Sequence, residues 1–296
     1  MQLRQSERKQ AKIKLAIQGC AGSGKTYSSL LLAFGITNNW SKIAVIDSEN
    51  GSADLYAHLG AYNVLNLNNN YSPENYMEAI SICENSGKID VIIIDSLSQS
   101  WDFLLEYHSG LSGNSFTNWG KITPRQNALI QKILQSKAHV ICTMRTKQDY
   151  VLNQKDGKFV PEKVGLKAVQ RDGLDYEFTL VFDVDIKHFA VSSKDRTGLF
   201  MGKPEFIISE LTGKRILDWC NSGISVETVK NDIAKAQTLE ELNSIYHQHP
   251  EWYPLLTTDF LNKKASILEA GENKPVINYL QNYIKNGNIN NATNAS

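Results

Sequence analysis

A glycine-rich octapeptide constrains the fold of this chain more than any other segment. Residues 19–26 read GCAGSGKT and match the pattern G-x-x-x-x-G-K-[ST]. The alternating residues 12–18 before it predict a β-strand, and residues 25–36 after it favour an α-helix. A turn of this composition between a strand and a helix presents backbone N–H groups at a helix N-terminus, where anions bind. The sequence therefore predicts a phosphate-binding loop.

The residue types in this octapeptide match the chemistry of a bound triphosphate. Glycines let backbone amides converge on the β-phosphate, while Lys25 can reach the β- and γ-phosphates. The Thr26 hydroxyl can bind Mg²⁺. We therefore expect ATP and Mg²⁺ as ligands. The nucleotide-binding residues would be Gly19, Cys20, Ala21, Gly22, Ser23, Gly24, Lys25 and Thr26.

Strand-like and helix-like segments alternate along the first half of the chain. Strands are expected at 42–48, 63–67, 90–96 and 139–145, and helices at 72–85 and 123–136. This alternation predicts an α/β fold with a mostly parallel central sheet flanked by helices. After residue 146 the pattern changes: Asp156-Gly157 indicates a hairpin turn, and residues 178–209 contain further strands, which we expect to be antiparallel.

The composition changes again towards the C-terminus. Leu, Ile and Tyr recur three and four residues apart after Ser225, which predicts a small helical appendage. The Asn-rich end has too few apolar residues to form a core. We therefore expect a core at residues 1–222, an appendage at 223–286 and a disordered tail at 287–296.

Two acidic residues follow predicted strands near the phosphate loop. Asp95 ends the apolar run VIII at 91–94, where a Walker-B carboxylate would bind Mg²⁺. Glu49 follows the strand at 42–48 and is expected to emerge at the same edge of the sheet. There it could orient or deprotonate a water in line with the γ-phosphate. The alternative for Glu49 is an ordinary solvated loop acid.

Several segments together resemble a known family. They read GCAGSGKTYSSL, AVIDSENGSA, VIIIDSLSQSW, GNSFTNWGKITPRQNALI, RTKQDYV and SSKDRTGLFMGKP. They are similar to the core of RecA-type recombination ATPases, and within these to phage RecA-like ATPases of the AAA-domain type, some grouped with single-strand annealing proteins. The resemblance spans residues 11–222. It implies a RecA-like P-loop NTPase core in which Glu49 is the catalytic base.

The resemblance also implies roles for three basic residues. RecA-like proteins place a polar sensor, usually glutamine, at the end of the fourth strand, and this chain has Arg145 there. Lys194 and Arg196 resemble residues that reach the nucleotide of a neighbouring subunit and stabilise transition-state charge. This would make the protein a homo-oligomeric ring or filament. The alternatives are a surface arginine and a charged turn.

A nucleic-acid surface is expected between Lys121 and Arg171. This stretch holds eleven Lys or Arg and three acids, although the whole chain is neutral with 31 residues of each sign. Basic residues contact phosphates, and aromatic rings can stack on single-stranded bases. The aromatic candidates are Phe116, Trp119, Tyr150 and Phe159. The resemblance assigns loops 108–121 and 146–170 to single-stranded DNA, while a solvated lysine face is the alternative.

Other protein classes are disfavoured by the sequence. The longest apolar runs are too short to span a membrane, and the N-terminus lacks a signal peptide. Four scattered cysteines fit a reducing cytoplasm, the host's if the chain is phage-encoded. We expect a hydrolase in phage recombination, annealing or replication, with a single-strand binding protein as a further candidate partner. A helicase-like or loader motor and a non-catalytic nucleotide-dependent switch stay open, as does RNA in place of DNA.

Overall fold

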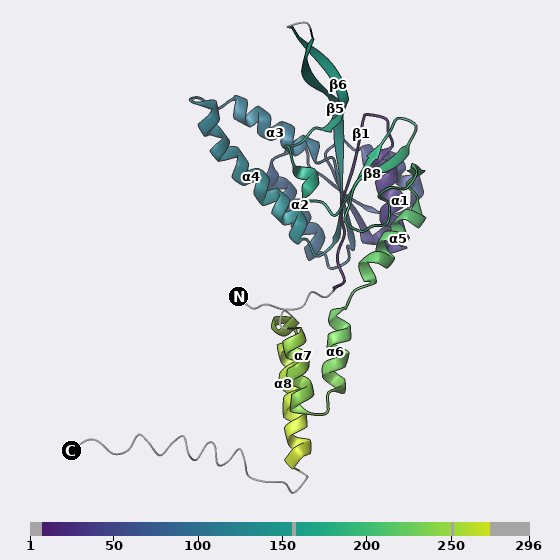
Figure 1. Cartoon of the computed structure of the whole chain (residues 1–296), viewed down its shortest axis with the longest axis vertical. Coiled ribbons are helices and arrows are strands. Elements are labelled where there is room, and N and C mark those ends of the chain that lie inside the picture. The colour runs from purple at the N-terminus through teal and green to yellow at the C-terminus, as the bar shows by residue number, and fades with distance from the viewer. Residues whose placement is uncertain (1–7, 156–157, 250–251, 273–296) are drawn as a thin grey trace, which may run out of the picture. The chain divides into compact units, whose positions relative to one another are not determined.

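The computed structural model describes residues 8–155, 158–249 and 252–272 (Figure 1). The expected disordered tail at 287–296 and the Asp156-Gly157 turn lie outside the described residues. The chain divides into two compact units. Residues 10–222 form the larger one, and residues 223–296 with the first nine residues form the smaller one.

A central sheet organises the larger unit, with strand order β3-β2-β4-β5-β1-β7-β8-β9. The strands from β3 to β7 in this order are parallel, whereas β8 and β9 add antiparallel pairs. Their bounds are β1 Lys14–Gly19, β2 Ile43–Asp47, β3 Asn63–Asn66, β4 Val91–Asp95, β5 His139–Lys155, β7 Leu180–Val184, β8 Phe189–Asp195 and β9 Phe206–Ile207. The predicted parallel sheet with an antiparallel extension is confirmed.

Helices cover both faces of this sheet (Figure 1). The helix α1 (Lys25–Thr37) and α5 (Glu210–Asn221) share one apolar core with the sheet, and α2 (Pro73–Asn85) and α4 (Ser115–Gln135) share the other. The central strand β4 is buried along its whole length, as expected for an apolar, β-branched strand covered on two faces. We call these two sides the α1 face and the α4 face.

Close contact between α1 and α5 depends on glycine. A Cβ atom on Gly35 would lie 2.0 Å from the Glu210 carbonyl oxygen, and one on Gly213 would lie 2.1 Å from the Leu32 carbonyl oxygen. No real side chain tolerates such contacts with backbone. The glycines therefore fix how closely α5 packs beside the helix that carries the phosphate loop.

The strand β5 runs past the edge of the sheet and pairs antiparallel with β6 (Lys158–Ala168) as a ribbon (Figure 1). Pairing extends from Thr146 with Ala168 to Lys155 with Lys158, with an irregularity between Asp149 and Tyr150. The antiparallel ribbon thus projects from the same strand end that carries Arg145.

The helices of the larger unit differ from the sequence prediction in three places. The sequence prediction gave no bounds for α3 (Ser98–Ser109) or α5, and α4 begins at Ser115 rather than 123. The Asn114 side chain caps α4 by accepting a 2.8 Å hydrogen bond from the Phe116 amide. Pro124 lies inside this helix. The expectation of a loop at 108–121 was therefore wrong for most of its length, because a capped helix continues through a proline that suggested a helix start.

The smaller unit has its own core. Its helices are α6 (Val226–Lys235), α7 (Leu239–Gln248) and α8 (Tyr253–Glu272). Buried side chains from each helix form this core, including Val229, Leu242 and Phe260. Ser225 and Thr238 cap the first two helices through their side chains. Across the described residues, none of the helices has the length and apolar character needed to cross a membrane.

Candidate functional site

The glycine-rich turn joins β1 to α1 as the octapeptide predicts. Gly22 and Gly24 have φ angles of 78° and 84°, which non-glycine residues rarely adopt. A Cβ atom on Gly19 would lie 2.4 Å from the Val184 carbonyl oxygen. Lys25 Nζ donates a 2.8 Å hydrogen bond to the Cys20 carbonyl oxygen, so its side chain folds back over the turn. The ammonium group is therefore already positioned where the turn would hold phosphate.

Carboxylates surround this ammonium group. Burial lowers the pKa of Lys25, and the nearby Asp95 and Glu49 carboxylates oppose that shift. Both predicted acids thus act electrostatically on the same lysine. A bound polyphosphate would add negative charge beside Lys25 and favour its charged form further.

Asp95 joins the turn to a neighbouring strand. Thr26 Oγ1 donates a 2.6 Å hydrogen bond to Asp95 Oδ2, and Thr143 Oγ1 donates a 2.5 Å bond to Oδ1. The carboxylate is only 2% exposed, and this burial raises its pKa despite both hydroxyl donors. A buried charge of this kind is costly without a cation.

This pair of oxygen donors fits Mg²⁺. The ion prefers hard oxygen ligands and is typically held by one or two carboxylates with phosphate oxygens and water. Among the described residues, no group of three or more His, Cys, Asp or Glu could hold a metal by itself. Thr26 and Asp95 would therefore hold the ion together with the triphosphate rather than as a separate protein cage.

Replacing Asp95 with Asn should stabilise the protein in the absence of nucleotide and Mg²⁺ at neutral pH. The folded-state pKa of Asp95 lies above its ordinary value, so the folded state binds the proton more tightly and loses stability as pH rises through that window. Thermal unfolding at acidic and neutral pH measures this. The difference between the variant and the wild type should shrink in acid, and an unchanged difference would contradict it.

Asp47 shapes the segment that carries Glu49. Its side chain is 2% exposed; Oδ1 accepts a 2.6 Å hydrogen bond from the Glu49 amide and Oδ2 accepts a 3.0 Å bond from the Ala53 amide. The carboxylate therefore fixes the backbone just after β2. These two hydrogen bonds hold Glu49 at the carboxyl end of β2.

Glu49 is engaged by a serine and an arginine from two other strand ends. Its Oε1 atom accepts hydrogen bonds from Ser96 Oγ at 2.9 Å and from Arg145 Nε at 3.0 Å. Arg145 Nη2 lies 2.7 Å from the same oxygen. The structure thus joins the predicted base to the residue at the predicted sensor position, a pairing that the sequence did not indicate.

Sheet register explains why these groups meet. β4 lies between β2 and β5, and β5 lies between β4 and β1, with Gly19 opposite Arg145. Side chains alternate between faces along a strand. Ile93 and Ile141 belong to the core on the α1 face, so Asp95, Thr143 and Arg145, which follow them at steps of two, lie on that same face.

Lys194 and Arg196 are not brought to this site. Lys194 Nζ donates to the carbonyl oxygens of Asp175, at 2.8 Å, and Tyr176. Arg196 Nη2 donates to the Tyr176 oxygen at 3.0 Å. Asp195 pairs with Leu180 at the amino end of β7, whereas the phosphate loop leaves the carboxyl end of β1. Within one chain these residues therefore lie towards the amino ends of the parallel strands, whereas the phosphate loop lies at their carboxyl ends.

The turn between β7 and β8 also contacts the phosphate loop, which the sequence did not predict. His188 Nδ1 lies 3.0 Å from the Ser23 carbonyl oxygen, and a Cβ atom on Gly24 would lie 3.1 Å from the same ring nitrogen. No motif in the sequence links these segments. Thr143 was missed for a similar reason, since it contributes through Asp95 on another strand.

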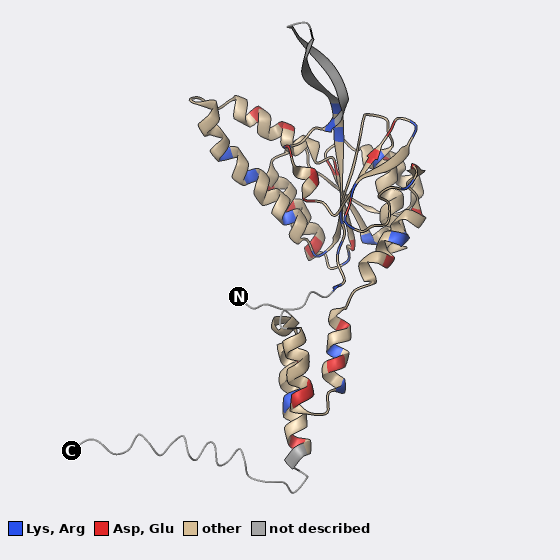
Figure 2. Cartoon of the chain, in the orientation of Figure 1, with Lys and Arg blue, Asp and Glu red and all other residues tan. Residues whose placement is uncertain are grey.

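The basic stretch between Lys121 and Arg171 is partly neutralised by ion pairs. In the described part of the chain, four of its cations pair with carboxylates: Arg125 with Glu74, Lys132 with Glu84, Arg145 with Glu49 and Lys167 with Asp172. Lys and Arg still lie along α4 and at the base of the β5–β6 ribbon (Figure 2). The electrostatic excess available to nucleic acid is therefore smaller than the sequence count suggests.

The aromatic residues expected to stack on bases differ in how exposed their rings are. Phe116 is 86% exposed at the start of α4. Trp119 instead stacks on His108 at 4.3 Å between ring centroids and lies 6.1 Å from Trp101. The side chains of Tyr150 and Phe159 lie outside the described residues. Of the two candidates whose side chains are described, Phe116 is exposed for stacking, while Trp119 packs between α3 and α4.

Comparisons with known proteins give a family match. A family model described as AAA domain matches residues 11–221. A search of curated proteins finds no match. The matched segment contains the phosphate loop, both acids and Arg145, so the family assignment and the site geometry concern the same part of the chain.

Proposed function

Because the chain belongs to the AAA domain family of P-loop NTPases, we propose that it is a Mg²⁺-dependent ATPase whose turnover is coupled to single-stranded DNA. One observation carries this proposal. Thr26 Oγ1 donates a 2.6 Å hydrogen bond to Asp95, and the Asp95 and Glu49 carboxylates both act electrostatically on Lys25. A site with a lysine, two oxygen ligands and a separate carboxylate is suited to transfer a phosphoryl group to water.

Each residue of this site has a defined task. Lys25 would neutralise charge on the β- and γ-phosphates, and Thr26 with Asp95 would hold the metal. Bound Mg²⁺ would offset charge on the phosphate oxygens. Glu49 would accept a proton from the attacking water. Hydrolysis at this site is favoured over a small-molecule kinase reaction because Glu49 supplies a carboxylate, besides the expected metal ligand Asp95, that could activate a water.

Arg145 controls whether Glu49 is free to act. Its guanidinium contacts Glu49 Oε1 through Nε and Nη2. A γ-phosphate beside Lys25 would offer a competing anion. We infer that Arg145 transfers from Glu49 to that phosphate, which releases the base and adds a positive charge where the transition state needs it.

Replacing Arg145 with Gln should lower the ATP turnover number by roughly 100-fold, the usual cost of one transition-state donor. The affinity for ATP should change much less. Steady-state kinetics and nucleotide titration separate the two quantities. A variant with raised turnover would instead show that Arg145 only restrains Glu49.

The proposed oligomer follows from where Lys194 and Arg196 lie. Both sit at the edge of the sheet away from the phosphate loop of their own chain. Their bonds to the backbone of residues 175 and 176 hold them close together. If they act on nucleotide, it must be that of another copy in a ring or filament.

Mixing two inactive variants tests this arrangement. Arg196→Ala lacks the proposed trans residue, and Lys25→Ala lacks the phosphate-binding lysine. A mixed assembly contains interfaces with an intact loop facing an intact Arg196, so we expect part of the wild-type ATPase rate to return. The rate is measured against each variant alone at the same total concentration. No recovery would place Arg196 outside the catalytic machinery.

Coupling to DNA is supported by the position of the β5–β6 ribbon. Val169 N donates a 2.7 Å hydrogen bond to the Arg145 carbonyl oxygen, and the Arg145 amide donates to Ser98 Oγ at 2.9 Å. The residue that contacts Glu49 therefore directly precedes Thr146, the first paired residue of the ribbon. A strand bound to the ribbon could shift Arg145 and alter turnover.

An ATPase assay with and without single-stranded DNA tests the proposed function. We expect stimulation by DNA, in keeping with a role in phage recombination, annealing or replication. Strand unwinding would favour a helicase-like or loader motor. ATP binding without turnover under any condition would favour a nucleotide-dependent switch. RNA and a single-strand binding protein belong in the same assay as alternative partners.

A further inference from the structure

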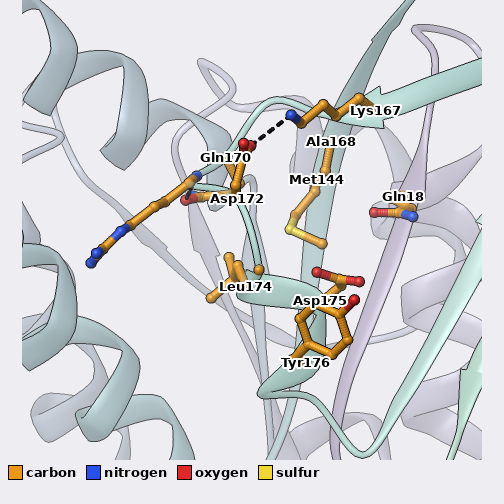
Figure 3. A pocket seen from close by; sticks show the side chains of 11 residues that line it. Gln18, Met144, Lys167, Ala168, Gln170, Asp172, Leu174, Asp175 and Tyr176 are labelled. Atoms are coloured by element: carbon orange, nitrogen blue, oxygen red, sulfur yellow. Dashed lines mark hydrogen bonds and ion pairs between the residues drawn. The ribbon is translucent and has the colours of Figure 1, made fainter. Parts of the chain in front are cut away.

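A cavity lies beside the carboxyl end of β1, on the face of the sheet opposite the expected phosphate site (Figure 3). It has a volume of about 410 Å³ and is covered by the segment that follows β6. Gln18 from β1 and Met144 from β5 form one wall. Asp175 and Tyr176 from the short 3₁₀ helix η3 (Leu174–Tyr176) also line the cavity.

Strand alternation separates this cavity from the phosphate site. Ile17 belongs to the core on the α1 face, whereas Ala16 and Met144 belong to the core on the α4 face. Gln18 follows Ala16 by two positions and therefore also points to the α4 face. The sheet thus lies between the cavity and the triphosphate, so a ligand could occupy each at the same time.

The cavity presents an unused hydrogen-bond acceptor. Gln18 Nε2 donates a 2.5 Å hydrogen bond to Asp183 Oδ1, which fixes the orientation of the amide. The other end, Oε1, is buried and has no hydrogen-bond partner among the described residues. A buried acceptor in this state costs stability unless a ligand satisfies it. The wall therefore suits a ligand with N–H donors.

An exposed aromatic ring stands at the same cavity. Tyr176 is 70% exposed, although its backbone and that of Asp175 accept hydrogen bonds from Lys194 Nζ. Lys194 Nζ also lies 5.8 Å from the centre of the Tyr176 ring. The ring is thus held in place while its surface stays open. Such a ring can stack on a planar ligand.

The lip of the cavity carries charges of both signs. Lys167 pairs with Asp172 at 2.8 Å (Figure 3). Arg171 Nη1 donates to Asn127 Oδ1 at 2.8 Å, and its guanidinium has further donors. Arg171 can therefore contact a phosphate, while Asp175 can accept a hydrogen bond from an amino group.

We propose that this cavity binds a nucleotide, with the base against Tyr176 and Gln18 and the phosphate at Arg171. The base would come from a nucleic-acid strand on the β5–β6 ribbon, since β6 ends at Ala168 in the cavity wall, or from a free mononucleotide. Binding of a base from a nucleic-acid strand rests on the proposed function. Gln18 precedes Gly19, and Met144 precedes Arg145, so the ligand would contact both strands that lead into the ATP site.

Binding of matched single strands with and without bases tests this cavity. Fluorescence anisotropy would compare a labelled oligonucleotide with an abasic strand of the same length. The wild type should bind the base-containing strand more tightly, by about fivefold or more for one stacked base. Tyr176→Leu and Gln18→Leu should remove most of that difference. Tyr246→Leu, a partly exposed tyrosine of the smaller unit, is the control.

A preference for bases that survives in both cavity variants would overturn the proposal. The proposal would also be overturned if Tyr176→Leu changed the oligomeric state of the protein and left oligonucleotide binding unaltered. The cavity would then serve contacts between copies of the chain. If the wild type binds neither strand, the DNA part of the proposed function fails while the cavity is still tested. Adenosine monophosphate is then titrated into Lys25→Ala protein by calorimetry. Binding that Tyr176→Leu abolishes supports the free-nucleotide source, and absence of binding overturns the proposal.

Discussion

Replacing Glu49 with Gln should lower ATP turnover by roughly 100- to 10,000-fold, the contribution expected of a general base. The amide keeps an oxygen that Ser96 Oγ and Arg145 can still contact, so the local structure should persist. ATP binding should therefore remain near the wild-type level. Steady-state turnover and equilibrium nucleotide binding, measured on the same preparation, show both effects.

Glu74→Gln is a matched control for this change. Glu74 also accepts hydrogen bonds from an arginine, with Arg125 Nε at 2.8 Å and Nη2 at 2.7 Å, but it lies on α2 away from the phosphate loop. Its replacement removes a comparable ion pair and should leave turnover unchanged. If Glu49→Gln kept a turnover rate close to that of the control, another group would have to activate the water.

Replacing Lys25 with Ala should reduce turnover by roughly 100- to 1,000-fold and also weaken ATP binding. The lysine is the cation held over the turn, and without it less positive charge would offset the repulsion between the phosphates and the Asp95 and Glu49 carboxylates. The loss of both ATP affinity and turnover would distinguish the role of Lys25 from that of Glu49, whose replacement should lower turnover alone. Nucleotide titration and steady-state kinetics report it directly.

Lys42→Ala is the matched control for the lysine. Lys42 forms a 2.7 Å ion pair with Asp90 at the amino end of β2, at the opposite edge of the sheet. Turnover by this control should equal that of the wild type. Full ATP binding and turnover by Lys25→Ala would show that the glycine-rich turn is not the nucleotide site.

Together the Lys25→Ala and Glu49→Gln variants test whether the two residues have different roles in the site. In the proposed mechanism, Lys25 would interact with phosphate in both the bound and the transition state, whereas Glu49 would act only when water attacks. The first substitution should therefore change affinity and rate, and the second mainly rate. A reversed pattern would mean that Glu49 contributes to binding, for example through its ion pair with Arg145.

Local features of the fold were predictable because they depend on short segments. The octapeptide at 19–26 specified a turn, since its glycines permit φ angles that other residues avoid. The apolar run before Asp95 specified a buried parallel strand. The start of α4 was placed too late because Pro124 resembles a helix start, whereas the cap at Asn114 and burial of Ile122 extend the helix towards its N-terminus.

The sequence by itself determined the phosphate loop, the alternation of strands and helices, and the two acids that follow strands. These depend on backbone preferences and on apolar periodicity, which act over a few residues. Only the tertiary structure decided that Arg145 contacts Glu49, that Thr143 shares Asp95 with Thr26, and that Gln18 faces a separate cavity. Those contacts depend on strand order and register, because parallel strands far apart in the chain become neighbours only when the whole sheet forms.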